Sequence, residues 1–109
     1  MTSGNKYPHQ VIRSKELEQK RLREFHELVS LGKKIELYCT VEGFHTCHLI
    51  VNGARLPKSV PTSLVRSWAA RGWCVMHHLE DFVPGVSKRW RIEVTDEGWM
   101  ALDDLEDAQ

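Results

Sequence analysis

The stretch PTSLVRSWAARGWCVMHHLEDFVPGVSKRWRIEVTDEGWMALDDL, residues 61–105, decides the fold of this chain. Apolar side chains recur at helical spacing in its first part and a glycine stop follows, so the pattern predicts a helix over 61–71. Two runs rich in strand formers, 73–80 and 88–94, come next on either side of a Pro-Gly turn. These features predict a β-hairpin directly after the helix.

The return strand of this hairpin alternates between apolar and charged side chains. The apolar set is Trp90, Ile92 and Val94, and the charged set is Arg89, Arg91 and Glu93. Because successive strand side chains point to opposite faces, we expect a hydrophobic row on the core and a basic row outside. A closing helix is expected next, capped by Thr95 and begun by two acids that suit the positive end of its dipole. Its core face is expected to hold Trp99, Leu102 and Leu105.

The N-terminal third predicts one more helix. Residues 1–10 are expected to be flexible, and a long helix is expected from an N-cap at Ser14 to a C-terminal stop at Gly32. Its second half carries an apolar stripe formed by Leu22, Phe25, Leu28 and Val29. Its first half is almost entirely charged, which indicates either a solvated helix face or an arm for dimerisation or partner binding.

Residues 35–57 change character. The runs 35–41 and 45–51 are rich in strand formers, and Asn52-Gly53 is a strong tight-turn signal. We therefore favour a second β-hairpin here, with a short helix as the alternative, because propensity is a weak guide. The segment between Pro57 and Pro61 is expected to be a loop.

Composition fits one small globular domain, expected over residues 11–107. The chain has 109 residues, of which 41% are hydrophobic and 28% charged. No apolar run approaches the ~20 residues of a membrane span and the N-terminus has no apolar signal core, so a cytoplasmic protein without a membrane partner is expected. The net charge is zero, but residues 96–109 hold six acids and no Lys or Arg, which leaves +6 on the rest. A basic body with an acidic tail can bind an anionic partner.

Two segments carry a resemblance to a known family. VTDEGWMAL, residues 94–102, looks like the segment after the wing in winged-helix regulators of the MarR and PadR type. LVRSWAARGW, residues 64–73, is similar to the end of their recognition helix. The resemblance covers residues 61–105 and implies an α+β, winged-helix-like domain. Its order is N-terminal helix, β-hairpin, recognition-type helix, wing hairpin and C-terminal helix.

In that family the matching helix enters the major groove and the hairpin contacts the backbone or the minor groove. The resemblance therefore implies double-stranded DNA as the ligand and implicates Thr62, Ser63, Arg66, Lys88, Arg89 and Arg91. Lys58 completes the expected set of DNA-binding residues. One departure lies upstream, because such regulators place two helices before the recognition helix, whereas residues 35–57 resemble strands. A winged-helix-like domain without a helix-turn-helix often serves as a protein-binding module instead.

Cysteines and histidines cluster in two places. The first group is Cys39, His45, Cys47 and His48, and the second is Cys74, His77 and His78. Four of them could converge on zinc, or a Cys-His pair could be catalytic, but the spacing matches no common site and no companion catalytic motif is present. Buried, reduced thiols beside surface histidines are favoured, so no metal, cofactor or enzymatic activity is expected.

The first expectation for function is a non-enzymatic module that binds double-stranded DNA, as a dimer, in transcription or replication control. The alternative is a small protein-binding adaptor or inhibitor, of the phage or mobile-element type, that acts on a host protein complex. The four tryptophans are expected mainly in the core, although Trp73, directly after Gly72, could be exposed. An exposed tryptophan would favour a protein interface over DNA.

Overall fold

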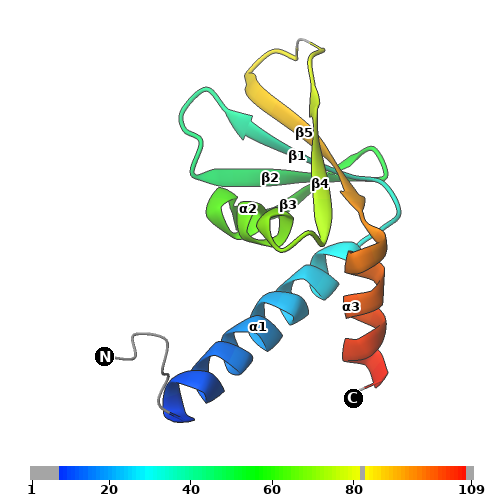
Figure 1. The fold of residues 1–109 in the computed structure, drawn as a ribbon. Helices are drawn as coiled ribbons and strands as arrows, with labels where there is room; N and C mark the ends of the chain where they lie inside the picture. Colours follow the sequence, from blue (N-terminus) through cyan, green and yellow to red (C-terminus); the bar gives the residue numbers. More distant parts are fainter. Residues whose placement is uncertain (1–7, 82, 108–109) are drawn as a thin grey trace.

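A five-stranded antiparallel sheet forms one layer of the molecule, one helix lies against it, and the other two helices extend from one end of the sheet (Figure 1). This computed structural model describes residues 8–81 and 83–107, with side chains from Lys15 onward. The elements within those residues are α1 (Pro8–Val29), β1 (Ile35–Thr40), β2 (Thr46–Val51), β3 (Ala54–Pro61), α2 (Thr62–Ala70), β4 (Cys74–Leu79), β5 (Val86–Val94) and α3 (Asp96–Asp107). The predicted α+β class is confirmed.

The strands join in the order β3-β2-β1-β5-β4. The two expected hairpins are thus one sheet, because β1 pairs with β5 along its whole length, from Ile35 opposite Ile92 to Thr40 opposite Val86. The tight turn is confirmed, since Asn52 and Gly53 both have positive φ, at 52° and 86°.

The loop expected between Pro57 and Pro61 is wrong, because that segment belongs to β3, which pairs with β2. The prolines are tolerated there because β3 is an edge strand, where a missing N–H can face solvent without breaking a ladder.

One face of the sheet and the inner sides of the helices form the core. Along β1 every second residue is buried, and β2 follows the same pattern. The largest fully buried side chains are Trp68, Phe25, Leu37, Leu49, Val65, Cys39 and Cys47, which come from α1, α2, β1 and β2. All of them belong to a single cluster. The other face of the sheet contributes nothing to this cluster, which leaves it available for another role.

Helix α1 differs from its expected bounds at both ends. It begins at Pro8, so the predicted N-cap at Ser14 is wrong: serine is tolerated inside a helix and is only a weak signal for its start. Residues 1–7 of the segment expected to be flexible lie outside the described residues. At the other end the helix stops at Val29, three residues before Gly32. Gly32 is needed for space, since a Cβ there would lie 2.5 Å from Val51 Cγ1.

Helices α2 and α3 begin and end close to the predicted residues. Gly72, with φ 79°, follows α2 as expected of a C-terminal glycine. Thr95 caps α3, because its Oγ1 accepts a hydrogen bond of 3.0 Å from the Gly98 N–H. Leu102 and Leu105 are buried as predicted, but the inward position of Trp99 is wrong, since 49% of this residue is exposed. Trp99 stands in the first turn of α3 and lines an open cavity.

Candidate nucleic-acid interface

Thr62 lies in the core and cannot contact DNA. Only 4% of the residue is exposed, and its hydroxyl lies 3.2 Å from Cys47 Sγ in a buried hydrogen bond. Its place in the first turn of α2 directs it onto β2, where a polar side chain finds its partner inside the protein. The expected DNA-binding role of Thr62 is therefore corrected.

Three other expected contacts, Lys58, Ser63 and Arg66, are exposed on the helical side of the sheet. Ser63 lines a cleft together with Arg21 and Glu24 of α1. Helix α1 therefore borders the surface of α2 that is expected to contact DNA. Lys58 lines a neighbouring cleft that also contains Glu24 and Glu27. Glu24 is paired with Arg21 at 2.6 Å, so DNA that approached Lys58 would meet the carboxylate of Glu27, which weakens that side of the surface as a phosphate site.

The expected residues of the wing do not share one face. The alternation predicted for β5 is confirmed: Ile92 is buried, and Trp90 and Val94 pack against the core. Lys88 lies on this same side, with its ammonium 5.2 Å from the centroid of the Phe44 ring. Arg89 and Arg91 occupy the opposite face, so the wing arginines and Arg66 of α2 lie on different sides of the sheet.

Two complete rows of cross-strand neighbours make up the helix-free face. The first row runs from β3 to β4 as Arg55, Ile50, Glu36, Arg91 and His77. The second row, in the same order, is Ser59, His48, Tyr38, Arg89 and Leu79. Because three arginines, two histidines and a tyrosine gather here, this face is the most chemically varied surface of the sheet. We call these ten residues the open face.

An aromatic pair lies at the centre of the open face. The rings of Tyr38 and His48 are 5.1 Å apart between centroids, and both residues remain partly exposed. The Arg55 guanidinium lies 5.2 Å from the centroid of the Tyr38 ring. Such an array of rings and a guanidinium plane offers stacking surfaces to a flat ligand.

Carboxylates neutralise part of the positive charge. A carboxylate oxygen of Glu36 lies 3.4 Å from Arg89 Nε and another lies 3.8 Å from Lys34 Nζ, and Arg89 also lies 3.6 Å from Asp81. The Nε of Arg89 lacks hydrogen-bond geometry towards Glu36, so this contact is electrostatic. Among the described residues, Arg55 and Arg91 of the open face have no such ion pair, and both are exposed.

One hydrogen bond at the border of the open face holds another carboxylate. His77 Nε2 and Glu93 Oε1 are 2.6 Å apart, and this hydrogen bond, followed by the charge of His77, lowers the pKa of Glu93. Glu93 is thus engaged by His77, and the charge of Arg91 contributes less than His77 to the lowering of the same pKa. Arg91 is exposed and forms no ion pair among the described residues.

The cysteines and histidines do not converge. Cys39 and Cys47 face the core with their sulfurs 3.9 Å apart, whereas His48 lies on the open face. Burial raises the pKa of Cys47 and of Cys74 from 9.0 to about 11, so both thiols hold their protons at neutral pH. Within the part of the chain that the structure describes, no three His, Cys, Asp or Glu side chains are grouped to hold a metal ion.

Comparison with known proteins adds no relative. Over residues 8–81 and 83–107, no helix combines the length and apolar character of a membrane span. A scan against protein-family models, a search of curated proteins and a search of solved structures each found no match.

Proposed function

We propose that this protein is a non-enzymatic module that binds single-stranded nucleic acid on its open face. The observation that carries the proposal is the pair Arg55 and Arg91, two exposed arginines without a carboxylate partner among the described residues. The Tyr38 and His48 rings lie beside them, in the second row of the same continuous surface. Arg55 and Arg91 stand three strands apart in the first row, roughly 14 Å, with Ile50 and Glu36 between them, so a base that stacks on the rings can have an arginine on either side of it.

The chemistry of this surface fits a single strand better than a duplex. Unpaired bases expose flat faces that stack on aromatic rings and guanidinium planes, while nearby arginines contact the phosphates. In a duplex those base faces are covered by their neighbours, so Tyr38 and His48 would have nothing to stack on.

Binding of a DNA duplex in the way that the sequence predicts requires α2 and the β4–β5 hairpin to contact the same ligand. The order α2, β4, β5, α3 is the order that the resemblance to winged-helix regulators implies. However, Arg66 and the wing arginines lie on opposite sides of the sheet, and Thr62 is buried. A duplex could therefore contact only part of the expected set at once. A role in transcription or replication control is compatible with either ligand and belongs to the same proposal.

Fluorescence polarisation with a labelled single-stranded RNA, a single-stranded DNA and a duplex of equal length tests the proposal. We expect a single strand to bind more tightly than the duplex, with an affinity that falls as salt increases. Arg55→Gln and Arg91→Gln should each reduce the slope of log affinity against log salt by about 0.7. Tyr38→Leu should weaken binding by about 1–3 kcal/mol, the range measured for base stacking.

Arg66→Gln is the matched control, because it removes the same charge from the helical side. If Arg66→Gln weakened binding while Arg55→Gln and Arg91→Gln did not, the open face would be the wrong surface and α2 the right one. Absence of binding to all three ligands at low salt would end the nucleic-acid proposal altogether.

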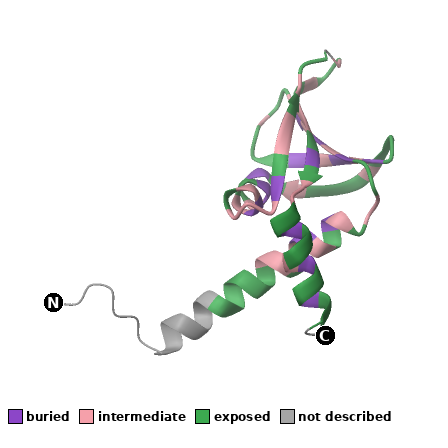
Figure 2. Cartoon of the chain, turned by 45° about the vertical axis from the view of Figure 1, so that its right-hand side comes forward, coloured by how far each residue is buried: buried purple, intermediate pink, exposed green. Residues whose placement is uncertain are grey.

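A protein-binding adaptor remains the second candidate, and the outer part of α1 favours it. Lys15–Lys20 are all exposed, and this stretch extends away from the sheet (Figure 2). It includes Leu17, an apolar residue that is 45% exposed. A short helical stretch that packs on nothing is only marginally stable in water, so a second copy of this chain or another protein could stabilise the outer part of α1.

Sedimentation over a range of concentrations tests self-association through this arm. The adaptor candidate in its homodimeric form predicts a dimer that Leu17→Glu disrupts. The control is Val41→Glu, which places the same charge on an exposed apolar residue of the β1–β2 loop. A monomer at all concentrations would remove the homodimer and leave only a foreign partner for α1.

A further inference from the structure

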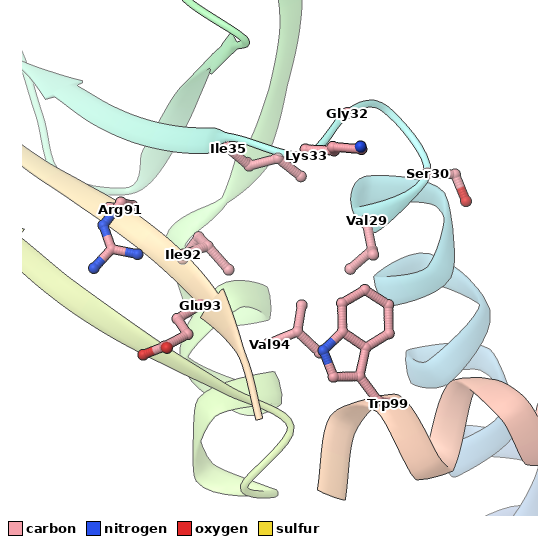
Figure 3. A pocket seen from close by; sticks show the side chains of 10 residues that line it. All are labelled: Val29, Ser30, Gly32, Lys33, Ile35, Arg91, Ile92, Glu93, Val94 and Trp99. Carbon is pink, nitrogen blue, oxygen red and sulfur yellow. The ribbon is translucent and has the colours of Figure 1, made fainter. Parts of the chain in front are cut away.

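A cavity of about 670 Å³ opens between the end of α1, strand β5 and the start of α3. Figure 3 shows Trp99 and Val29 on one side of it, facing Ile35, Ile92 and Val94 on the other. Ile35 and Ile92 are buried and form its apolar floor. This volume lies within the range of roughly 300–1,000 Å³ that is usual for small-ligand sites.

The cavity has a rigid aromatic wall. A Cβ at Gly98 would collide with the carbonyl oxygen of Trp73, so the first turn of α3 sits directly against the start of β4. The Thr95 cap fixes the same turn from the other side. Trp99 is therefore held at the cavity by backbone packing, although half of its own surface is exposed. An indole that the core does not need, at the wall of an apolar cavity, is suited to binding.

The charged side chains around the cavity differ in their ion pairing and in their orientation towards Trp99. Lys33 lies at its edge and is exposed, and it forms no ion pair among the described residues, in contrast to Lys34, which pairs with Glu36. Arg91 and Glu93 also line the cavity, but their charged groups project away from Trp99 (Figure 3). Glu93 is moreover hydrogen-bonded to His77. Lys33 is thus the cation best placed to meet a ligand that enters beside Trp99.

We propose that this cavity binds a small amphipathic anion. The apolar part of the ligand lies between Trp99 and the Ile92–Val94 wall, and its carboxylate lies at Lys33. The apolar part can be an aromatic ring or a short alkyl chain, because both fit an indole wall and an aliphatic floor. This site adjoins the open face at Arg91, but the proposal does not depend on nucleic-acid binding.

Two pairs of probes test the proposal by NMR titration of the Trp99 indole N–H in the full chain. Naphthalene-1-acetate and octanoate represent the ring and the chain, and their neutral amides are the matched controls. We expect each carboxylate to shift the Trp99 signal in a saturable way and to bind more tightly than its amide. Lys33→Gln should weaken the carboxylates about threefold, the size expected for an exposed ion pair, and should leave the amides unchanged.

Trp99→Ala should weaken all four probes at least about tenfold, because it removes one wall of the cavity. The signals of Val29 and Ile92 report on binding in this variant. Met100→Ala, at an exposed neighbour outside the cavity, is the control and should have no effect. Equal affinity for carboxylates and amides, or no shift at millimolar probe, would overturn the proposal. Tyr38→Leu should not change probe binding, so the outcome is independent of the open face.

Discussion

At the scale of single residues, buried polar atoms decide which positions can face a ligand. Thr62 and Arg66 both lie on α2, and the sequence places them on the same polar side of the helix. In the structure Thr62 shares a hydrogen bond with Cys47, whereas Arg66 is exposed. A threonine can satisfy its hydroxyl inside a core at little cost, but a buried guanidinium would need an ion pair. Helical spacing alone therefore grouped these two residues incorrectly.

The buried thiols make the free energy of unfolding depend on pH in the alkaline range. The folded-state pKa of Cys47 and Cys74, about 11, exceeds the ordinary value of 9.0. Between these values the unfolded chain loses thiol protons that the folded chain keeps, so the stabilisation present below pH 9 is lost as pH rises towards 11. We expect a loss of about 1 kcal/mol for each thiol near pH 10.

Urea unfolding at neutral and at alkaline pH measures this loss, and Cys74→Ala isolates one thiol. The variant should be less stable at neutral pH but should lose less stability on going to high pH than the wild type. An identical pH dependence in both proteins would show that Cys74 keeps an ordinary pKa.

Gly98→Ala sets helix propensity against a steric collision. In an open helix, alanine is more stable than glycine by about 1 kcal/mol. Here the new Cβ would overlap the backbone oxygen of Trp73, which cannot move as freely as a side chain. Since overpacking typically costs about 1–3 kcal/mol, we expect net destabilisation, measured by thermal or urea unfolding. Met100→Ala, at an exposed position of the same helix, should change stability little, and a stabilising Gly98→Ala would refute the close approach.

At the scale of elements, local signals worked wherever the neighbouring residues alone determine the geometry. The Asn52-Gly53 turn, the Gly72 stop and the Thr95 cap all depend on a few adjacent residues, and all three are confirmed. Strand β3 was missed because its prolines are unfavourable in strands generally but tolerated at a sheet edge. Whether a strand is at an edge depends on the whole sheet, which no local pattern contains.

The two halves of helix α1 are expected to differ in local stability. Phe25 and Leu28 are buried in the core, whereas Lys15–Lys20 are exposed throughout. Among the described residues, the ion pair that joins this exposed stretch to the end of α2 is Glu18–Arg71, at 2.5 Å, where Arg71 follows the last residue of the helix. Because local opening follows buried contacts, we expect amide hydrogens of 15–20 to exchange at least about tenfold faster than those of 22–29.

Hydrogen exchange followed by mass spectrometry or NMR measures this difference. Arg71→Gln should speed exchange in the exposed stretch further and leave the buried half unchanged. Uniform slow exchange along α1 in a dilute monomer would mean that its outer part is stabilised by contacts other than those described here.

At the scale of the whole molecule, the candidate site depends on pairing between distant segments. The sequence predicted the charged row of β5, including Arg89 and Arg91, but it gave no reason to join that row to Tyr38 or Arg55. The join is made by β1, which pairs with β5 across some fifty intervening residues. This pairing brings Arg89 and Arg91 onto the same face as Arg55 and the aromatic pair. The fold class was therefore predictable from local patterns, whereas the open face was not.

Glu36 sits at the centre of this assembly and limits its positive charge. It pairs with both Arg89 and Lys34, so Glu36→Gln should free Lys34 and leave Arg89 with Asp81 as its one carboxylate partner among the described residues. If that face binds a single strand, the variant should bind more tightly, and the salt dependence should steepen by about 0.7 for each cation that gains a phosphate. Asp104→Asn makes the same change in net charge on exposed α3 and should alter binding little, because charges beyond about 10 Å are screened. Polarisation titrations at several salt concentrations measure both variants. An equal gain from Asp104→Asn would mean that overall charge, not the open face, controls binding.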